Sequence, residues 1–142
     1  MATFPASNMH LVGSLSYGQY VTVVYGQNSH WYPAFSFGGQ KGDRVTISVS
    51  STDGDAVAWL LDHQHKELAK NDDANSMTLD SLIHMTLPGN SDPHIPTYYI
   101  VFRDYGFQQA HFTVRLNRQF GWPVMNVLPP ARPPKARFPL QF

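Results

Sequence analysis

Apolar residues recur at every second position along much of this chain, and this period constrains the fold more than any other feature. Residues 44–50 alternate valine or isoleucine with threonine or serine, and residues 56–62 and 110–116 repeat the alternation. Successive side chains of a β-strand point to opposite faces, so each segment predicts a strand with one face in the interior. We expect one shared core that is formed by Val45, Ile47, Val49, Val57, Trp59, Leu61, Phe112, Val114 and Leu116.

Segments rich in aromatic and β-branched residues predict four more strands, at residues 20–25, 34–37, 82–87 and 98–103. Glycine, proline, asparagine and aspartate separate the segments at intervals of about ten residues, which is the rhythm of sandwiches and barrels. Residues 65–70 predict a short helical turn at most. The chain is therefore expected to be all-β, an antiparallel β-sandwich of about seven to nine strands.

Composition argues against several classes of protein. The 142 residues are 42% hydrophobic and 14% charged, a balance that indicates a folded domain rather than a disordered chain. Ten basic residues balance ten acidic ones, so no net charge draws the domain to nucleic acid or to an anionic membrane. The sequence has no cysteine, which excludes disulfides, thiolate nucleophiles and cysteine zinc sites.

The chain divides into three parts by composition. Residues 1–16 predict an N-terminal extension, residues 17–116 contain all the predicted strands, and residues 117–142 carry six prolines, as polyproline II segments do. Residues 1–13 lack the basic start and apolar run of a signal peptide. No apolar stretch reaches the roughly 20 residues needed to cross a bilayer, so we expect no membrane insertion.

Several short sequences together resemble a known family. They are Ala-Phe-Ser-Phe at 34–37, Lys-Gly-Asp-Arg-Val-Thr-Ile at 41–47, Thr-Tyr-Tyr-Ile-Val at 97–101 and His-Phe-Thr-Val at 111–114. In this order and spacing they resemble the bacterial pre-peptidase C-terminal domain, over roughly residues 17–116. The chain departs from the family where Pro96 and Thr97 replace a glycine, and where the preceding loop is lengthened by residues 90–96.

The resemblance implies a jelly-roll-like β-sandwich that is attached to a secreted protein. Members of this family accompany exported proteases, and relatives in clostridial collagenases bind collagen, with calcium at some sites. We therefore expect a non-catalytic accessory or binding module of a secreted bacterial protein, located outside the cell or at its surface. Its expected partner is an extracellular polymer, either a protein fibre or a polysaccharide, or another protein. The alternative is a structural protein that assembles with a partner chain or with itself through the proline-rich tail.

Two loops carry the oxygen ligands that calcium prefers, commonly six to eight of them. The candidate metal ligands are Asp53, Asp55, Asp72, Asp73 and Asn75. A site requires that the two loops meet at one end of the sandwich. The other interpretation is that these side chains only cap turns, because aspartate and asparagine fold onto nearby backbone.

Early aromatic residues provide the candidate ligand surface, which consists of Tyr17, Tyr20, Tyr25, Trp31 and Tyr32. On a half-buried sheet some of these rings must face outward, where flat rings stack on sugars or contact a fibrous partner. In the collagen-binding relatives the ligand face is also rich in tyrosine. The alternative is that the rings fill the core and its edges, as aromatic residues do in sandwiches.

The sequence does not indicate catalysis. A Gly-x-Ser-x-Gly elbow is absent, and the seven histidines are scattered over different predicted elements. Only His63 and His65 have a spacing that zinc can use, and the sequence shows no third ligand. We therefore expect a non-enzyme, with zinc hydrolysis through this pair as the remaining catalytic alternative.

Overall fold

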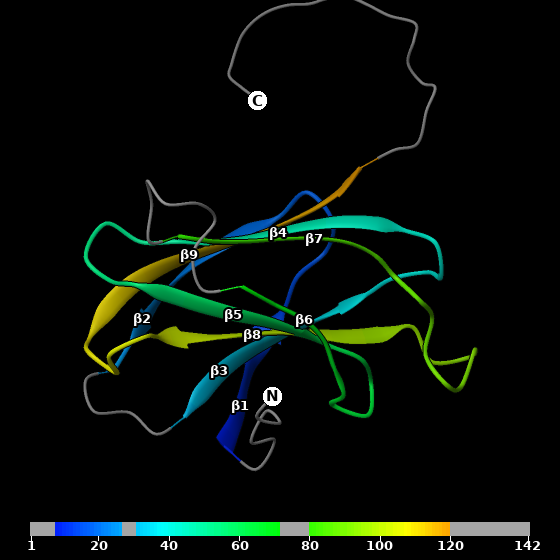
Figure 1. Cartoon of the computed structure of the whole chain (residues 1–142), viewed down its shortest axis with the longest axis horizontal. Helices are drawn as coiled ribbons and strands as arrows, with labels where there is room; N and C mark the ends of the chain where they lie inside the picture. The colour runs from blue at the N-terminus through cyan, green and yellow to red at the C-terminus, as the bar shows by residue number, and fades with distance from the viewer. Residues whose placement is uncertain (1–7, 27–30, 72–79, 120–142) are drawn as a thin grey trace, which may run out of the picture.

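The computed structural model describes residues 8–26, 31–71 and 80–119. Nine β-strands lie within these ranges (Figure 1). They are β1 (Met9–Ser14), β2 (Tyr20–Tyr25), β3 (Tyr32–Gly38), β4 (Arg44–Ser50), β5 (Ala56–Leu61), β6 (Glu67–Asn71), β7 (Ser81–Thr86), β8 (Thr97–Asp104) and β9 (Ala110–Gln119). Asp72, Asp73, Asn75 and residues 120–142 lie outside the described residues, so what was predicted of them stays a prediction.

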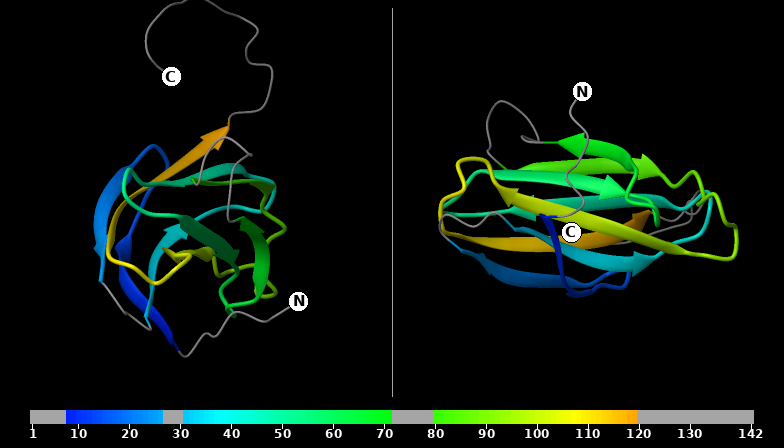
Figure 2. Two further views of the ribbon diagram at one scale, coloured as in Figure 1. Left: turned by 60° about the vertical axis from the view of Figure 1, so that its left-hand side comes forward. Right: turned by 90° about the horizontal axis from the view of Figure 1, so that it is seen from below.

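The strands form two stacked sheets (Figures 1 and 2). One sheet has five strands in the order β1-β3-β8-β5-β6, and the other has four in the order β2-β9-β4-β7. Every pair is antiparallel except β1 and β3, which run parallel. The predicted all-β sandwich is confirmed. In the ranges that the structure describes, no helix is long and apolar enough to cross a bilayer.

The main core lies between the two sheets. The alternating apolar residues predicted for β4 and β9 all point into it, with exposed fractions of 2% or less. The five-stranded sheet contributes Phe35 and Phe102, whose rings stack with their centres 6.3 Å apart. Phe112 meets Phe102 from the opposite sheet at 5.7 Å. Each fully buried side chain of this size contributes about 1.5–3 kcal/mol to folding, so this interior is the main source of stability.

Strand β5 has the opposite orientation to the one predicted from sequence. Val57, Trp59 and Leu61 point to the outer side of the five-stranded sheet, where they form a second apolar cluster with Ala34 and Val101. The prediction that these three residues of β5 share the main core was therefore wrong.

The physical reason is the volume of the neighbouring rings. Ala56 and Ala58 face the interior, and Ala58 is the direct partner of Phe102 across the sheet. Protein interiors are packed to nearly constant density, so a strand opposite three phenylalanine rings presents small residues to them. All six residues of β5 are apolar and buried. The sequence of this strand therefore has no polar face from which its orientation could be predicted.

The sandwich extends beyond residues 17–116 at both ends. Strand β1 lies within the segment that was expected to be an N-terminal extension, and it forms an edge of the five-stranded sheet. Strand β9 continues to Gln119, where it is still the partner of Arg44 in β4. The first edge strand was missed because Met9–Ser14 shows no clean alternation of apolar and polar residues.

The helical turn predicted at residues 65–70 was also wrong. A tight turn precedes strand β6, and one carboxylate oxygen of Asp62 accepts hydrogen bonds from the amides of Gln64 and Lys66. His65 takes a positive φ of 66° in this turn. The chain therefore reverses direction at once and pairs with β5 instead of forming a helix.

Candidate functional site

One end of the sandwich is organised around the loop between β4 and β5, residues 51–55. Asp80, just before β7, accepts a hydrogen bond from the Ser51 amide at 3.0 Å. Asp104, at the end of β8, accepts one from the Asp55 amide at 2.9 Å. Carboxylates therefore tie this loop to the start of β7 in one sheet and to the end of β8 in the other.

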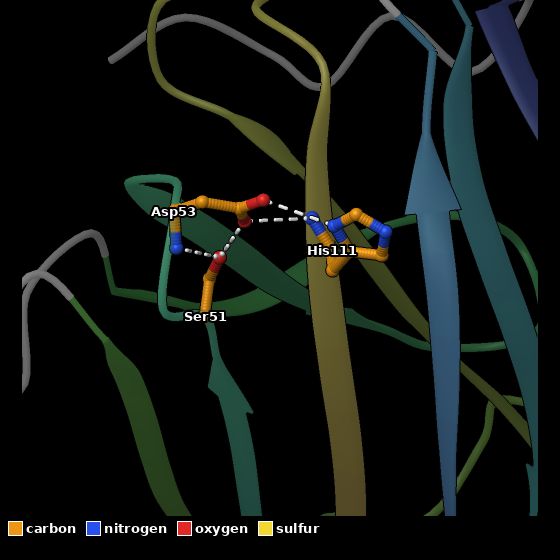
Figure 3. Close-up of polar contacts among 3 residues, drawn as sticks. All are labelled: Ser51, Asp53 and His111. Atoms are coloured by element: carbon orange, nitrogen blue, oxygen red, sulfur yellow. Dashed lines mark hydrogen bonds and ion pairs between the residues drawn. The ribbon is translucent and has the colours of Figure 1, made fainter.

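Asp53 joins the tip of the same loop to β9 (Figure 3). Its Oδ1 accepts hydrogen bonds from Ser51 Oγ at 3.0 Å and from the His111 amide at 2.9 Å, and its Oδ2 lies 2.9 Å from His111 Nδ1. These hydrogen bonds, those from His111 first, stabilise the ionised carboxylate and lower the pKa of Asp53 to about 2. Both side chains stay about half exposed, so the loop is held by polar contacts rather than by burial.

Ser51, Asp53 and His111 do not form a nucleophilic triad. In such a triad the histidine contacts the serine, and the carboxylate holds the other nitrogen of the histidine. Here the carboxylate lies between the other two, and Ser51 Oγ donates its proton to Asp53 rather than to an imidazole. The arrangement fixes a loop and supplies no activated nucleophile.

The histidine pair of the zinc alternative is engaged elsewhere. His63 Nε2 lies 3.2 Å from Ser91 Oγ, and the His65 ring meets the Tyr99 ring edge-on at 5.1 Å. Among the described residues, no group of three or more histidine, cysteine, aspartate or glutamate side chains is placed to hold a metal ion. The pair thus gains no third ligand within those residues.

The residues that flank the second loop of the predicted calcium site are held at this end of the sandwich. Asn71, the last residue of β6, accepts a hydrogen bond from Ser81 Oγ at 2.9 Å, and Asp80 holds Ser51. Asp80 therefore contacts the loop that carries Asp53 and Asp55, and Asn71 contacts Ser81, the residue after Asp80. Since Asp72, Asp73 and Asn75 lie outside the described residues, the calcium site stays a prediction.

The structure separates the five early aromatic residues, and three of them leave the proposed ligand surface. Tyr25 is 1% exposed and packs edge-on against Phe112, so it belongs to the core. Tyr17 is half-buried, and its hydroxyl donates a hydrogen bond to Asp43 at 2.8 Å. Tyr20 is 60% exposed but lies on the four-stranded sheet, away from the other rings.

Trp31 and Tyr32 remain together on the five-stranded sheet. Trp31 is 56% exposed, just before β3, and its ring lies 5.6 Å from that of His10 in β1. Tyr32 is half-buried and its ring lies 5.5 Å from that of Trp59 in β5. Of the five candidates, Tyr32 alone packs against the second apolar cluster, on the side of the sheet turned away from the main core, whereas Trp31 contacts His10 in β1.

This outer aromatic face consists of Tyr32, Ala34, Val57, Trp59, Leu61, Lys70, Tyr99, Val101 and Arg103. Two cations lie over its rings. Lys70 Nζ is 5.5 Å from the centre of the Trp59 ring, and the Arg103 guanidinium is 5.7 Å from Tyr32 and 6.0 Å from Trp59. Cations at this distance from an aromatic face are attracted by its quadrupole.

Sequence reasoning missed Trp59, Lys70, Tyr99 and Arg103 as members of this face. Trp59 was assigned to the interior with the rest of its strand. The available signal was the unbroken apolar run of β5. A strand that is apolar on both faces packs one face in the core and needs a second apolar layer or a binding partner for the other.

The lengthened loop before β8 walls a separate hollow of about 500 Å³. Asn90 holds this loop in place, because its Nδ2 donates to the carbonyls of Ile95 and Thr97 at 2.6 and 3.0 Å. Its Oδ1 accepts a hydrogen bond from the His63 amide at 3.0 Å. Tyr98 lines the hollow from β8, and burial raises the pKa of its hydroxyl.

Comparison with known proteins gives a likeness in fold alone. No family model and no curated protein matches the sequence. The pre-peptidase C-terminal domain of a collagenase from Bacillus anthracis is 13% identical, with a TM-score of 0.52, over 77% of this chain and 94% of that one. A periplasmic inhibitor of g-type lysozyme from Aeromonas hydrophila is 11% identical, with a TM-score of 0.58, over 79% and 98%. A surface-associated copper-binding protein from Methylomicrobium album is 9% identical, with a TM-score of 0.49, over 77% and 98%.

The expected resemblance is thus confirmed at the level of the fold. The chain has the sandwich of a pre-peptidase C-terminal domain, and the likeness spans nearly the whole of that domain. The same sandwich is similar to that of a periplasmic inhibitor. One fold therefore serves different roles, and the role of this chain must be argued from its own surface.

Proposed function

We propose that this domain is a non-catalytic binding module of an exported protein, and that it holds an extracellular polymer on the outer aromatic face. The supporting observation is the second apolar cluster on the side of the five-stranded sheet turned away from the core. Antiparallel sheets commonly present a polar outer side, because one buried face is enough to hold the sandwich together. The five members of that cluster are themselves 0–6% exposed, so the half-buried rings of Tyr32 and Tyr99 and the exposed Lys70 form the surface that a ligand meets. Partly exposed aromatic rings beside a cation are typical of an interaction surface.

The rings of this face suit a chain-like ligand. Tyr32 and Tyr99 are both half-buried, so each keeps part of its surface available to a ligand. Flat rings bind the apolar faces of sugar rings, or the flat side chains of a protein fibre. Lys70, which is exposed, donates hydrogen bonds to hydroxyl or carbonyl oxygens of such a ligand.

Export is part of the proposal. Two solved structures of similar fold, each with a TM-score above 0.5, are a domain of a collagenase and a periplasmic inhibitor. Both names support a location outside the cytoplasm, either secreted or at the cell surface.

Calcium is proposed as a stiffening ligand at the loop end, held by Asp53, Asp55, Asp72, Asp73 and Asn75. The supporting observation is that Ser51 and Asp80 join the two loops there. Calcium that binds the folded chain must raise its melting temperature, because a ligand of the native state stabilises it by mass action. An unchanged melting temperature at saturating calcium would remove this part of the proposal and leave the polymer-binding face untouched.

Co-sedimentation tests the polymer. The full chain is mixed with insoluble collagen fibrils and, separately, with insoluble polysaccharides, and the bound fraction is measured with calcium and with a chelator. Tyr99→Ala removes a ring of the outer aromatic face, and Tyr20→Ala removes an exposed ring from the other sheet as the matched control. We expect Tyr99→Ala to weaken binding at least about tenfold, as loss of a central contact ring does.

The two variants separate the outcomes. Retention on one class of polymer, lost with Tyr99→Ala and kept with Tyr20→Ala, supports the proposal and selects the ligand class. Retention on neither class contradicts it, and so does an equal loss in both variants.

A further inference from the structure

One side of the sandwich is open. Strands β1 and β2 are edges of the two sheets, and they lie along the same side of the molecule (Figure 2, blue). This side carries Leu11, Val12, Tyr20 and Val24, which are 48–60% exposed. These are four of the six large apolar side chains that are exposed in the described residues. A free sheet edge that carries exposed apolar side chains is a site for pairing with another strand.

The opposite side of the sandwich, formed by the edge strands β6 and β7, is closed by hydrogen bonds between the two sheets. There Ser81 Oγ at the start of β7 donates hydrogen bonds to the carbonyls of Asn71 and Ala56 in the other sheet, at 2.9 and 2.6 Å. Strand β6 also carries Glu67 and Lys70, and its register shifts beside β5. Charges and bulges of this kind protect an edge from pairing.

Strand β2 has none of these protections. Its sequence, Tyr-Val-Thr-Val-Val-Tyr, contains no charge and no proline, and its register with β9 is continuous over six residues. Within the described residues, no strand lies along its other edge. The neighbouring edge, β1, is interrupted by a register shift between Leu11 and Gly13. The regular strand β2 is therefore the better template for pairing.

We propose that β2 pairs antiparallel with β2 of a second copy of this chain, about a twofold axis through Thr22. In this register Tyr20 meets Val24 of the second copy, Val21 meets its Val23, and Thr22 meets its Thr22. Each pair joins side chains of the same face, and aromatic with β-branched pairs stabilise antiparallel strands. An axis through Val23 would leave both copies of Tyr20 without a partner.

A second copy is the occupant that the strand itself fits. The sequence of β2 is self-complementary in this register, and no charge on the strand opposes a like charge across the axis. The four-stranded sheet then continues into an eight-stranded one. Isologous contacts of this kind close as dimers.

The size of the contact predicts its strength. A six-residue strand is about 20 Å long. Two sheets about 10 Å apart, with a side-chain layer of about half that spacing outside each, make the open side about 20 Å deep, so it presents on the order of 400 Å² per copy. Stable complexes bury about 800 Å² per partner. We therefore expect a reversible dimer with a dissociation constant in the micromolar range rather than a permanent one.

Sedimentation equilibrium of the full chain tests the dimer, from about 1 μM to about 500 μM. Val24→Lys adds a charge to the pairing edge, and Thr86→Lys adds the same charge to an exposed position on β7 as the matched control. We expect the wild type and Thr86→Lys to dimerise alike, and Val24→Lys to raise the dissociation constant at least about a hundredfold. A wild type that stays monomeric throughout, or equal behaviour of the two variants, overturns the proposal.

Disulfide trapping tests the register without disturbing the edge. The chain has no cysteine, so a single introduced thiol reports on one position. Paired antiparallel residues have Cα atoms about 4.5–5.5 Å apart, which suits a disulfide. Thr22→Cys is expected to form a covalent dimer on mild oxidation, because residue 22 of one copy lies opposite residue 22 of the other. Val24→Cys is not expected to do so, because residue 24 of one copy lies opposite residue 20 of the other. Equal cross-linking of the two variants, or none in Thr22→Cys, contradicts the twofold axis through Thr22.

Discussion

Replacing Asp104 by alanine is expected to destabilise the fold more than any other single loss of a carboxylate in the described loops. Asp104 is 4% exposed and lies where the β4–β5 loop meets the turn after β8. Its Oδ1 accepts a hydrogen bond from the Asp55 amide, and its Oδ2 accepts from the amides of Gly106 and Gln108, each at 2.9 Å. One side chain thus holds two loops in register.

The magnitude follows from these three bonds. A hydrogen bond to a carboxylate contributes about 1.5 kcal/mol or more, so the three together contribute at least about 4.5 kcal/mol. Gly106 and Gln108 are exposed residues whose amides can bind water after the change, which reduces the expected loss to about 3 kcal/mol. That is a large part of the roughly 5–15 kcal/mol by which domains are stable. Asp104→Asn should lose about half as much, because its amide group can face only one set of donors.

Urea unfolding measures both variants against a matched control. Asp92→Ala removes an exposed carboxylate that accepts a single hydrogen bond, from the His94 amide, and should change the free energy of unfolding by less than about 0.5 kcal/mol. The order expected for the loss of stability is Asp104→Ala, then Asp104→Asn, then Asp92→Ala. An Asp104→Ala protein as stable as Asp92→Ala would refute this account of the loop end.

Three further predictions concern the core and the loop. Ala58→Lys should prevent folding, because Ala58 faces the main core, whereas a domain that tolerates this lysine would contradict the orientation of β5. Gly54→Ala should destabilise the domain, since a methyl group there would lie 2.5 Å from the Cβ of Ala110. Thermal unfolding measures the loss of stability, and an unchanged melting temperature would contradict the close approach of Gly54 to Ala110. The pKa of Asp53 is lowered from 3.8 to about 2, so the stability it contributes is complete above about pH 4 and is lost as the pH falls towards 2. The difference in melting temperature between the wild type and Asp53→Asn should therefore shrink over that interval, and a constant difference would show that the carboxylate does not act through its charge.

Alternation of apolar and polar residues was enough to predict the class of fold and most of the strands. The alternation predicted the orientation of a strand where one face is turned to solvent, as in β4, whose threonine and serine residues face outward. It could not orient β5, where every residue is apolar and the volume of Phe102 and its neighbours decides the side. It also missed β1, because most residues of this strand are exposed and no buried face imposes an alternation on them.

The candidate site was less predictable for the same kind of reason. The aromatic residues from Tyr17 to Tyr32 are close in sequence, but the chain passes between both sheets within that segment and scatters the rings. Trp59 and Tyr99 are 40 positions apart and become neighbours of Tyr32 only through the order of β3, β8 and β5 in the sheet. Contacts between distant segments require the topology, which the sequence pattern does not contain.

Residue-by-residue mapping of bound polymer is the most direct test of the outer aromatic face. A soluble fragment of the retained polymer is titrated into isotope-labelled full chain, and the shifts of the amide resonances are followed by NMR. The account predicts that the shifts concentrate at Tyr32, Lys70 and Tyr99, with Tyr20 and Thr22 on the other sheet unchanged. Shifts that centre on the four-stranded sheet, or on the hollow beside Asn90, would place the binding surface elsewhere and contradict the proposed function.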